Sequence, residues 1–368
     1  MLVTRKKFFI TEPILTIDIG AGTTDILIYF PDRGELYKAV TISAIKRTAQ
    51  YILKEKGELL ITGTIMGGGA VSKAVVQKAK TDNVYMTPEA AKTVDNDIEK
   101  VKEKGITIVS EEEASHLLKN KSLKHIRFAD LFLPEIKPVL TQLGAEWSFS
   151  YIAGAVQDHG VCPEGVSALD FRHQALKERI KHSPSPEEFL FLYEEVPDYL
   201  TRMKATGKIL SQIPHRKLFM MDTGMAAIVG ASLDPRVLGC THYITVDIGN
   251  SHTLGAVLNE GLIGGFFEYH TDGLNPRKME ELLINLGDGR LNHQEIVSQG
   301  GHGAYIRFCP GFGKIEKIVV TGPRRREIMK DISIDYIEGA PLGDNMMTGA
   351  SGLLESINRK EKLNLNYQ

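Results

Sequence analysis

Cysteine is scarce in this chain of 368 residues, and its three positions are far apart. Cys162, Cys240 and Cys309 form no C-x-x-C pair, so their spacing predicts neither a disulfide framework nor a zinc ribbon. Widely spaced, unpaired thiols are typical of proteins kept in a reducing compartment. We therefore expect a cytoplasmic protein.

Long apolar runs and an excess of one charge are also missing. No stretch approaches the roughly 18 consecutive apolar residues that a membrane-spanning helix needs, so no membrane partner is expected. The apolar run within positions 1–10 is too short for a signal peptide. The formal net charge of −2 provides no broad basic surface, which argues against a nucleic-acid partner.

The rest of the composition is that of a globular protein. Hydrophobic residues make up 42% of the chain and charged residues 24%. At this length, that balance suits one large or two medium domains with full cores. The segment Ser232–Gly239 is the best candidate for a linker, and it predicts domains at 1–238 and 239–368.

Two segments of the chain repeat one plan. The first reads as a strand, then Asp18-Ile-Gly-Ala-Gly-Thr-Thr-Asp25, then a second strand. The other, Tyr243–Leu258, reads as a strand, then Asp247-Ile-Gly-Asn-Ser-His-Thr, then a strand. Each predicts a hairpin with a carboxylate at the mouth of its turn. Similarity at this distance indicates duplicated halves and not a solenoid.

The composition of the two turns suggests a phosphate site. Glycine and small residues let successive backbone N–H groups point inward, which makes a concave anion site. Two facing turns would hold a polyphosphate from both sides, with Asp18 and Asp247 beside a bound Mg²⁺. The alternative, which one copy alone would favour, is a pair of ordinary hairpins. The residues expected at the phosphates are Gly20, Gly22, Thr23, Thr24, Gly249, Asn250, Ser251 and Thr253.

These two segments resemble the phosphate motifs of the actin-like ATPase superfamily, which includes actin, heat-shock chaperone ATPases and sugar kinases. The resemblance implies an α/β fold of two RNase-H-like domains, the first with helical insertions, and an ATP–Mg²⁺ cleft between them. It also implies an adenosine motif, which Lys317–Pro323 matches through Thr321 and Gly322, although a proline replaces the second glycine. Positions 343–350 resemble the superfamily's final connecting helix, which places the adenosine near Gly322 and Gly343.

The strand predicted over Phe149–Val156 ends in an amide, a carboxylate and an imidazole, those of Gln157, Asp158 and His159. Such a group can orient or deprotonate the nucleophile that attacks a γ-phosphate. In actin the comparable strand ends in a glutamine that positions water, and sugar kinases place an aspartate base there. By resemblance, either Gln157 or Asp158 takes that role. The alternative is a polar loop in which Asp158 and His159 cap the next turn.

Other predictions concern segments around this strand end. A helix is expected over Pro186–Tyr193, and Arg202 is expected on a solvated helix face. The segment Asp222–Gly224 is interpreted as a strand-to-helix turn at the cleft. The segment Gln299–Gly303 is predicted to be a flexible loop, in which His302 has no ligand role.

More closely, the whole chain resembles a DUF1786-like prokaryotic family whose members sometimes carry the label "putative pyruvate formate-lyase activating enzyme". A radical-SAM activating enzyme needs three closely spaced cysteines for its iron–sulfur cluster, and this chain lacks them, so we exclude that chemistry. The superfamily resemblance implies instead an ATPase or ATP-dependent phosphotransferase acting on a small molecule. One alternative is an ATP-driven activator of a partner enzyme, for which Cys162 is the candidate cluster cysteine, although a structural role is favoured. A nucleotide-switched scaffold ranks last.

Overall fold

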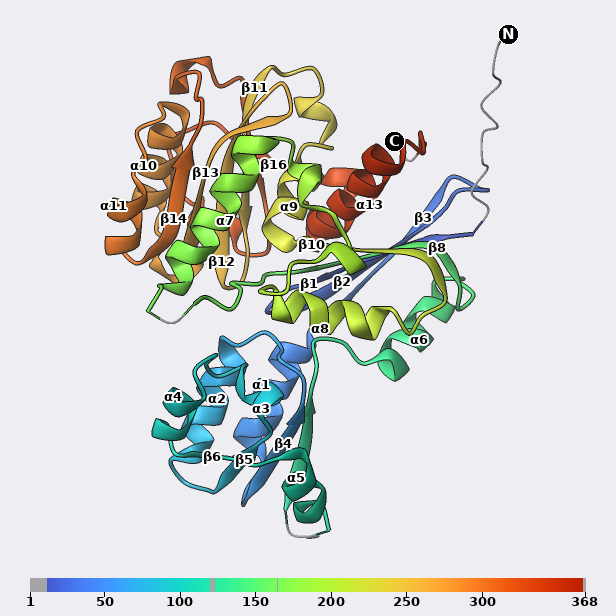
Figure 1. The fold of residues 1–368 in the computed structure, drawn as a ribbon. Coiled ribbons are helices and arrows are strands. Elements are labelled where there is room, and N and C mark those ends of the chain that lie inside the picture. Colours follow the sequence, from blue (N-terminus) through green and yellow to red (C-terminus); the bar gives the residue numbers. More distant parts are fainter. Residues whose placement is uncertain (1–11, 120–122, 164, 367–368) are drawn as a thin grey trace.

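The computed structural model describes residues 12–119, 123–163 and 165–366, so the run considered for a signal peptide lies outside the described residues. Two large β-sheets form the upper and middle parts of the molecule, and a smaller sheet lies at the bottom (Figure 1). Helices lie between the two large sheets and on their outer faces. The main body is therefore layered as helix, sheet, helix, sheet, helix.

The first large sheet contains the first predicted hairpin. In spatial order its strands are β3 (Glu35–Ile42), β2 (Thr23–Phe30), β1 (Ile14–Ile19), β8 (Phe149–Val156), β10 (His215–Asp222) and β9 (Phe191–Leu192). The first three form an antiparallel meander, and β8 and β10 run parallel to β1. This order, with a reversed second strand, is that of an RNase-H-like domain and confirms the predicted fold class.

The second large sheet repeats the order of β3, β2, β1, β8 and β10, gains a strand at one edge and has no counterpart of β9 at the other. Its strands are β14 (Gly301–Ile306), β13 (Leu262–His270), β12 (His252–Asn259), β11 (His242–Ile248), β15 (Lys317–Thr321) and β16 (Ile337–Glu338). The predicted flexible loop at 299–303 is wrong, because β14 begins at Gly301 and pairs with β13. Glycine and histidine hid this strand in the sequence, since neither favours extended structure by itself.

A smaller α/β unit is inserted between β3 and β8. Its parallel strands are β6 (Ile106–Ile108), β5 (Val84–Met86), β4 (Leu59–Gly63) and β7 (Lys124–Phe128). The helices of this part of the chain are α1 (Ala44–Lys54), α2 (Ala70–Ala79), α3 (Pro88–Ala91), α4 (Ile98–Glu103) and α5 (Glu111–Leu117). Local signals begin two of them, since Ser43 caps α1 and Ser110 with Glu113 forms a capping box on α5. The unit has a core of its own.

The other helices cover the two large sheets. The outer face of the first sheet packs on α6 (Leu133–Gln142) and α8 (Thr201–Leu210). The outer face of the second packs on α10 (Pro276–Gly287), α11 (His293–Ser298) and α12 (Arg325–Ile328). Between the sheets lie α7 (Ala168–His182), α9 (Thr223–Ala231) and α13 (Thr348–Glu361).

Two of these inner helices cross with their backbones in contact. A Cβ on Gly230 of α9 would lie 1.8 Å from the carbonyl oxygen of Thr348, and a Cβ on Gly352 of α13 would lie 1.8 Å from that of Ala226. Only glycine fits at either position. Because α9 packs on β11 and α13 packs on β1, this crossing joins the two large sheets (Figure 1).

One predicted helix is wrong. The segment Pro186–Tyr193 contains a 3-10 turn at Pro186–Phe189 and then the short edge strand β9. Phe189, Leu190 and Phe191 are all buried, which a helix with one apolar face does not allow for three successive side chains. Throughout the described residues, every helix is too short or too polar to cross a bilayer.

Candidate functional site

The first hairpin places two carboxylates opposite each other. Asp18 is the next-to-last residue of β1 and is paired in register with Asp25 on β2, so both side chains point to the same face of the sheet. Thr223, the first residue of α9, donates its hydroxyl to Asp18 Oδ1 at 2.6 Å. The predicted strand-to-helix turn at 222–224 therefore lies at the cleft and holds this aspartate in place.

The second hairpin holds its aspartate in a similar way. Thr321, at the end of β15, donates its hydroxyl to Asp247 Oδ1 at 2.8 Å. The next residue, Gly322, has φ of +91°, and a Cβ there would lie 2.4 Å from the carbonyl oxygen of Ile248. Its amide donates to Asn345 Oδ1 at 3.1 Å. The strand–Thr–Gly segment predicted as an adenosine motif thus packs directly beside Asp247.

The two hairpin turns meet at the cleft between the large sheets. A Cβ on Gly22 would lie 2.3 Å from Asn250 Nδ2, so the turns touch in this structure. Asp18 and Asp247 lie close enough for the charge of Asp247 to act on the ionisation of Asp18. The two predicted aspartates therefore share one cleft, although each comes from a different sheet.

The carboxylates at this junction resist ionisation. Burial raises the pKa of Asp18 to about 7, and the charges of Asp247 and Asp222 add to the rise. Burial and then the charge of Asp18 raise the pKa of Asp25 to about 8. Burial also raises the pKa of Asp247. Among the described residues, Asp25 Oδ1 is buried without a hydrogen-bond partner. Such a group of oxygens fits a hard divalent cation.

The residues predicted to hold phosphate do not all face the cleft. Thr23 lies on the Asp18 face and its hydroxyl reaches Asp25 Oδ2 at 3.4 Å. Thr24, the next residue along β2, lines a different pocket, beside Asp130. The buried Thr253 hydroxyl bonds that of Thr271 at 3.0 Å.

The glycines of the motifs also differ in their surroundings. The amides of Gly20 and Gly249 close their own turns, donating to the carbonyls of Thr23 and His252 at 2.9 Å. They are therefore already bonded in this structure and do not point to a ligand. Gly343 has φ of +80° and open space where a Cβ would stand.

The three side chains at the strand end 157–159 make different contacts. Gln157 donates its amide to Glu268 Oε1. Asp158 accepts the backbone N–H of Gly160 at 2.8 Å and that of Met203 at 2.9 Å, so both of its oxygens are occupied. That placement favours the capping alternative for Asp158. His159 lies beside three other polar side chains described below.

Two largely buried arginines, Arg172 and Arg202, organise the cleft, and neither was predicted to lie there. Arg172 on α7 bonds Asp222 at 2.9 Å and Glu268 at 3.2 Å. Arg202 was predicted on a solvated helix face, which is wrong: it is largely buried and pairs with Asp130 at 2.7 Å. It also donates to the carbonyl oxygen of Gln157 at 2.6 Å. Arg172 donates in turn to the carbonyl oxygen of Asp158 at 2.8 Å, so both guanidiniums bond the main chain of the strand end.

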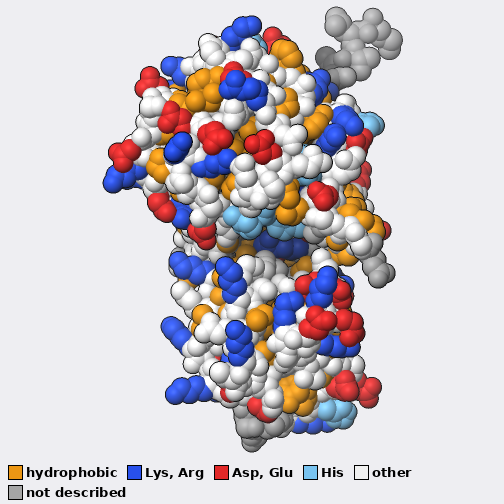
Figure 2. Space-filling model, turned by 90° about the vertical axis from the view of Figure 1, so that its left-hand side faces the viewer, with side chains coloured by type: hydrophobic (Ala, Val, Ile, Leu, Met, Phe, Trp, Pro, Cys, Tyr) orange, Lys and Arg blue, Asp and Glu red, His pale blue; other side chains and the backbone are white. Residues whose placement is uncertain are grey.

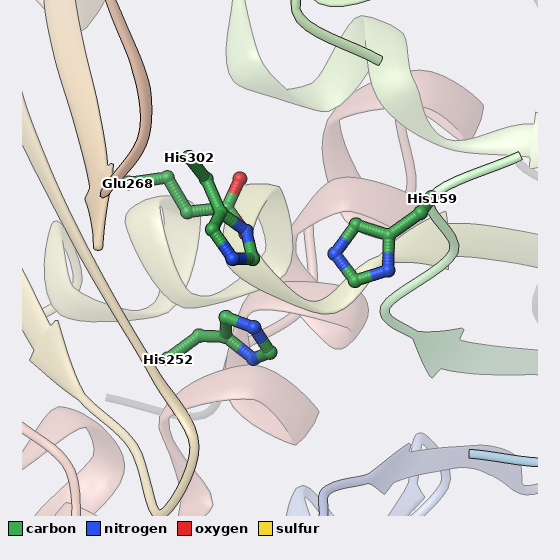
Figure 3. Close-up of side chains that lie close together, drawn as sticks. All are labelled: His159, His252, Glu268 and His302. Carbon is green, nitrogen blue, oxygen red and sulfur yellow. The ribbon is translucent and has the colours of Figure 1, made fainter. Parts of the chain in front are cut away.

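Three histidines and a glutamate gather beside this strand end, and we call them the histidine cluster: His159, His252, Glu268 and His302. His302 was expected to have no ligand role in a loop, but it is buried on β14 with its ring 4.7 Å from that of His252. One signal for the cluster was present in the sequence, since Glu268 interrupts an apolar strand. Figure 3 shows the side chains converging from opposite sides of the cleft.

A pocket of about 430 Å³ connects Asp247 with this cluster. Figure 2 shows histidine side chains along the hollow between the upper unit and the rest of the molecule, with basic side chains beneath them. The polar residues of the pocket lining come from both halves of the chain: Gln157, Arg172, Asp222, Thr223, Asp247, His252 and Glu268.

The cysteines do not join this site as a group. All three thiols are free, and they lie on separate parts of the fold. Burial raises the pKa of Cys240, and it raises the pKa of Cys309 to about 11, so both are protonated at neutral pH. A protonated thiol is a poor metal ligand. The described geometry agrees with the exclusion of a three-cysteine cluster.

Comparisons with solved structures return proteins of low identity. The ethanolamine utilization protein EutJ from Carboxydothermus hydrogenoformans is 12% identical, with 93% of this chain and 88% of that chain covered and a TM-score of 0.33. MreB5 of Spiroplasma citri bound to ADP is 12% identical over 96% and 98%, with a TM-score of 0.34. Component A of the Acidaminococcus fermentans (R)-2-hydroxyglutaryl-CoA dehydratase is 11% identical over 93% and 96%, at 0.33. Identities and TM-scores this low carry no argument about the fold, which is assigned from the strand order described above.

No curated protein matches the sequence. A family model does match, over residues 66–327, which is well over half of the chain. Its description is "Putative pyruvate format-lyase activating enzyme (DUF1786)". The matched span begins just after β4, ends within α12, and includes the strand end at 157–159, the second hairpin and the histidine cluster. The chain therefore belongs to the DUF1786 family.

Proposed function

We propose that this protein binds ATP with Mg²⁺ at the junction of the two hairpins. The observation that supports the proposal most is the meeting of two equivalent turns, one from each large sheet, with Asp18 and Asp247 in mutual electrostatic reach. Magnesium would supply charge neutralisation to the phosphate oxygens, since it prefers carboxylate and water ligands. Asp18, Asp25 and Asp247 would hold it.

Binding would require the two turns to separate. Gly22 and Asn250 are in contact, and a polyphosphate does not fit between touching residues. Domain closure around a ligand is a common motion of two-domain proteins. We infer that the structure is a closed form and that the crossing of α9 and α13 is the pivot. Closure would then exclude water and align the phosphates.

We further propose that the chemistry is hydrolysis of ATP or transfer of its γ-phosphate to a small molecule. The pocket of about 430 Å³ beside Asp247 is where a water or an acceptor hydroxyl would lie. Gln157 lines this pocket and its amide already donates a hydrogen bond into it, so Gln157 would orient the nucleophile. Arg202 would hold Gln157 by its main-chain oxygen.

Calorimetry of nucleotide binding tests the first part. We expect the double variant Asp18→Ala with Asp247→Ala to lose Mg²⁺-dependent binding of ATP, because it removes two of the carboxylates proposed to bind the metal ion. Asp32→Ala is the matched control, since Asp32 is an exposed aspartate in the turn that joins β2 to β3. Unchanged affinity in the double variant would refute the proposed metal-nucleotide site.

Turnover tests the second part. Gln157→Ala, Asp158→Ala and His159→Ala should each spare binding, and at least one of them should lower phosphate release by about 10²–10⁴, the usual contribution of a general acid or base. Full activity in all three variants would place the chemistry elsewhere.

A second candidate is an ATP-driven activator of a partner enzyme. The observation in its favour is the edge strand β3, which exposes Tyr37, Val40 and Ile42 to solvent. Apolar side chains on a sheet edge are typical of a surface that another protein covers. Hydrolysis stimulated by one metabolite, with a phosphorylated product, would favour the phosphotransferase. Hydrolysis stimulated only by a protein fraction would favour the activator.

A further inference from the structure

The histidine cluster brings ligands from both halves of the molecule to one point. His159 follows β8 of the first large sheet, while His252, Glu268 and His302 come from three adjacent strands of the second. One ligand atom from each side chain can be chosen so that all four lie within 4.8 Å of one another. The rings face a common space from opposite sides (Figure 3).

Each imidazole of the cluster has a buried nitrogen without a partner in the described part of the chain. These atoms are His159 Nε2, His252 Nε2 and His302 Nδ1. Burying a polar atom without a hydrogen bond costs roughly 1–3 kcal/mol, so three such atoms at one point call for a common ligand. Burial lowers the pKa of His159 to about 3 and that of His252 to about 3, so both rings are neutral and carry a free lone pair at neutral pH.

The other nitrogen of His302 is already bonded. Its Nε2 lies 2.9 Å from Nε2 of His270 on β13, so one of the two carries the proton between them. When that proton is on His302, its Nδ1 is a lone-pair donor, 3.5 Å from Glu268 Oε1. A neighbour that fixes the tautomer of a ligand histidine is the usual second contact of a metal site.

The charges around the cluster favour a cation. Burial acts to raise the pKa of Glu268, but the Arg172 guanidinium holds that pKa well below its usual range. Arg172 faces two carboxylates, those of Asp222 and Glu268, so one negative charge is left over. Arg172 bonds Glu268 Oε2, while Oε1 accepts the Gln157 amide and lies 3.5 Å from His302 Nδ1.

We propose that the three imidazoles and the carboxylate of the histidine cluster bind a divalent first-row transition cation, with Zn²⁺ as the reference ion. Three imidazole nitrogens and one carboxylate oxygen form a ligand set that suits Zn²⁺, and imidazole also suits iron, nickel and copper. Ligands of a tetrahedral Zn²⁺ at about 2.0–2.1 Å from the metal lie roughly 3.4 Å apart. The four ligand atoms lie within 4.8 Å of one another, so metal binding would draw them closer by up to about 1.4 Å.

The cation would join the two halves of the molecule. Because His159 belongs to the first sheet and the other ligands to the second, bound metal holds the cleft closed at the end of the pocket that His252 and Glu268 line. This role does not depend on nucleotide. The carboxylates proposed for Mg²⁺ are different residues, so the two sites can be tested separately.

Metal binding by the full chain tests the proposal directly. After treatment with a chelator, the protein is titrated with Zn²⁺ in a calorimeter without nucleotide, and with Co²⁺ in a spectrophotometer. We expect one tight site per chain, the visible absorption of tetrahedral Co²⁺, and a rise in Tm on adding Zn²⁺. The double variant His252→Gln with His302→Gln should weaken binding at least about 100-fold, since it removes two ligands and loss of a second-shell partner alone costs 10–100-fold.

The control removes two other histidines from the same region. His173 and His293 stack with ring centroids 3.7 Å apart, outside the cluster. His173→Gln with His293→Gln should keep the Co²⁺ spectrum. The variant Asp18→Ala with Asp247→Ala should keep it too, which separates this site from the proposed nucleotide site. Circular dichroism confirms that each variant is folded. No tight Zn²⁺ binding by the wild type, or equal loss in both histidine variants, would overturn the proposal.

Discussion

The two hairpins share one backbone and differ in side chains. In each, the amide of the first glycine donates at 2.9 Å to the carbonyl three residues later, which belongs to Thr23 in the first and to His252 in the second. Across the strand pair from the aspartate lies Asp25 in the first hairpin and Leu254 in the second. The same frame therefore carries an extra carboxylate on one side of the cleft and an imidazole on the other.

This difference separates two kinds of cation chemistry. Oxygen ligands suit Mg²⁺, whereas imidazoles suit transition metals. The first hairpin gathers Asp18 and Asp25, and its partner extends His252 into the histidine cluster. The duplicated halves share the hairpin backbone. Their ligand types differ because Thr23 and Asp25 of the first hairpin correspond to His252 and Leu254 of the second.

Gly349 on α13 is expected to give the largest effect. A Cβ at Gly349 would lie 1.9 Å from Asp18 Oδ2, whereas the Cβ of a substituted Gly249 would be 4.0 Å from Asp247 Oδ2. Gly349→Ala should displace Asp18, cost about 1–3 kcal/mol of folding free energy as overpacked sites do, and weaken ATP binding. Thermal unfolding and calorimetry measure the two effects. Gly313→Ala, which enters open space, is the control, and equal behaviour of the two would contradict the packing argument.

Asp25→Leu makes the first hairpin resemble the second. If the extra carboxylate contributes to Mg²⁺, ATP affinity in its presence should fall about tenfold, equivalent to roughly 1.4 kcal/mol. Asp25→Asn keeps the shape and removes the charge, so it should give a similar loss. Wild-type affinity in both variants would exclude Asp25 from the site.

The stability of the metal-free protein should respond to pH in opposite ways at the two hairpins. The folded state raises the pKa of Asp25 to about 8, so it binds a proton that the unfolded chain releases, and stability falls as pH rises from about 4 to 8. His252 has a folded pKa of about 3, so stability falls as pH drops below about 6.5. In chelator, Asp25→Asn should raise Tm by a few degrees at pH 8, and His252→Gln should raise it near pH 5. Parallel Tm profiles for wild type and both variants would contradict these ionisation states.

The smallest effects concern the hydroxyls. Thr24 and Thr253 occupy equivalent positions and face away from the cleft, so Thr24→Val and Thr253→Val should change ATP affinity by less than about twofold. Thr23 donates a hydrogen bond to Asp25. Thr23→Val should therefore weaken ATP binding by about 1 kcal/mol, a roughly fivefold loss of affinity, which is the usual contribution of a single hydrogen bond. Calorimetry resolves that gap, and the reverse ranking would mean that the cleft uses the other face of β2.

Local patterns predicted most of the frame. The strands of both hairpins, the helix after Ser43 and the strand ending at Val156 were legible because alternation and capping residues act over a few positions. The repeated motif also predicted that Asp18 and Asp247 lie at one cleft, and the structure places them within electrostatic reach of each other.

The contacts that set the chemistry were not predictable in this way. Arg172 and Arg202 lie on amphipathic helices, where a charged residue ordinarily faces water. Their burial depends on Asp222 and Asp130, which are distant in the sequence. Likewise, His302 became a ligand candidate only because β14 lies beside β13. Partners brought together by tertiary structure leave little trace in the residues around each one.

A helix from each half of the chain packs on the large sheet of the other half. This packing has a consequence for any attempt to divide the molecule at the proposed boundary between 238 and 239. The N-terminal piece would keep α7 but lose the strands of the second sheet on which that helix rests, and the C-terminal piece would keep α13 without β1. Each piece expressed alone would expose to solvent the apolar surface that the other piece normally covers. Mixed or co-expressed, the two should reassociate, each completing the other.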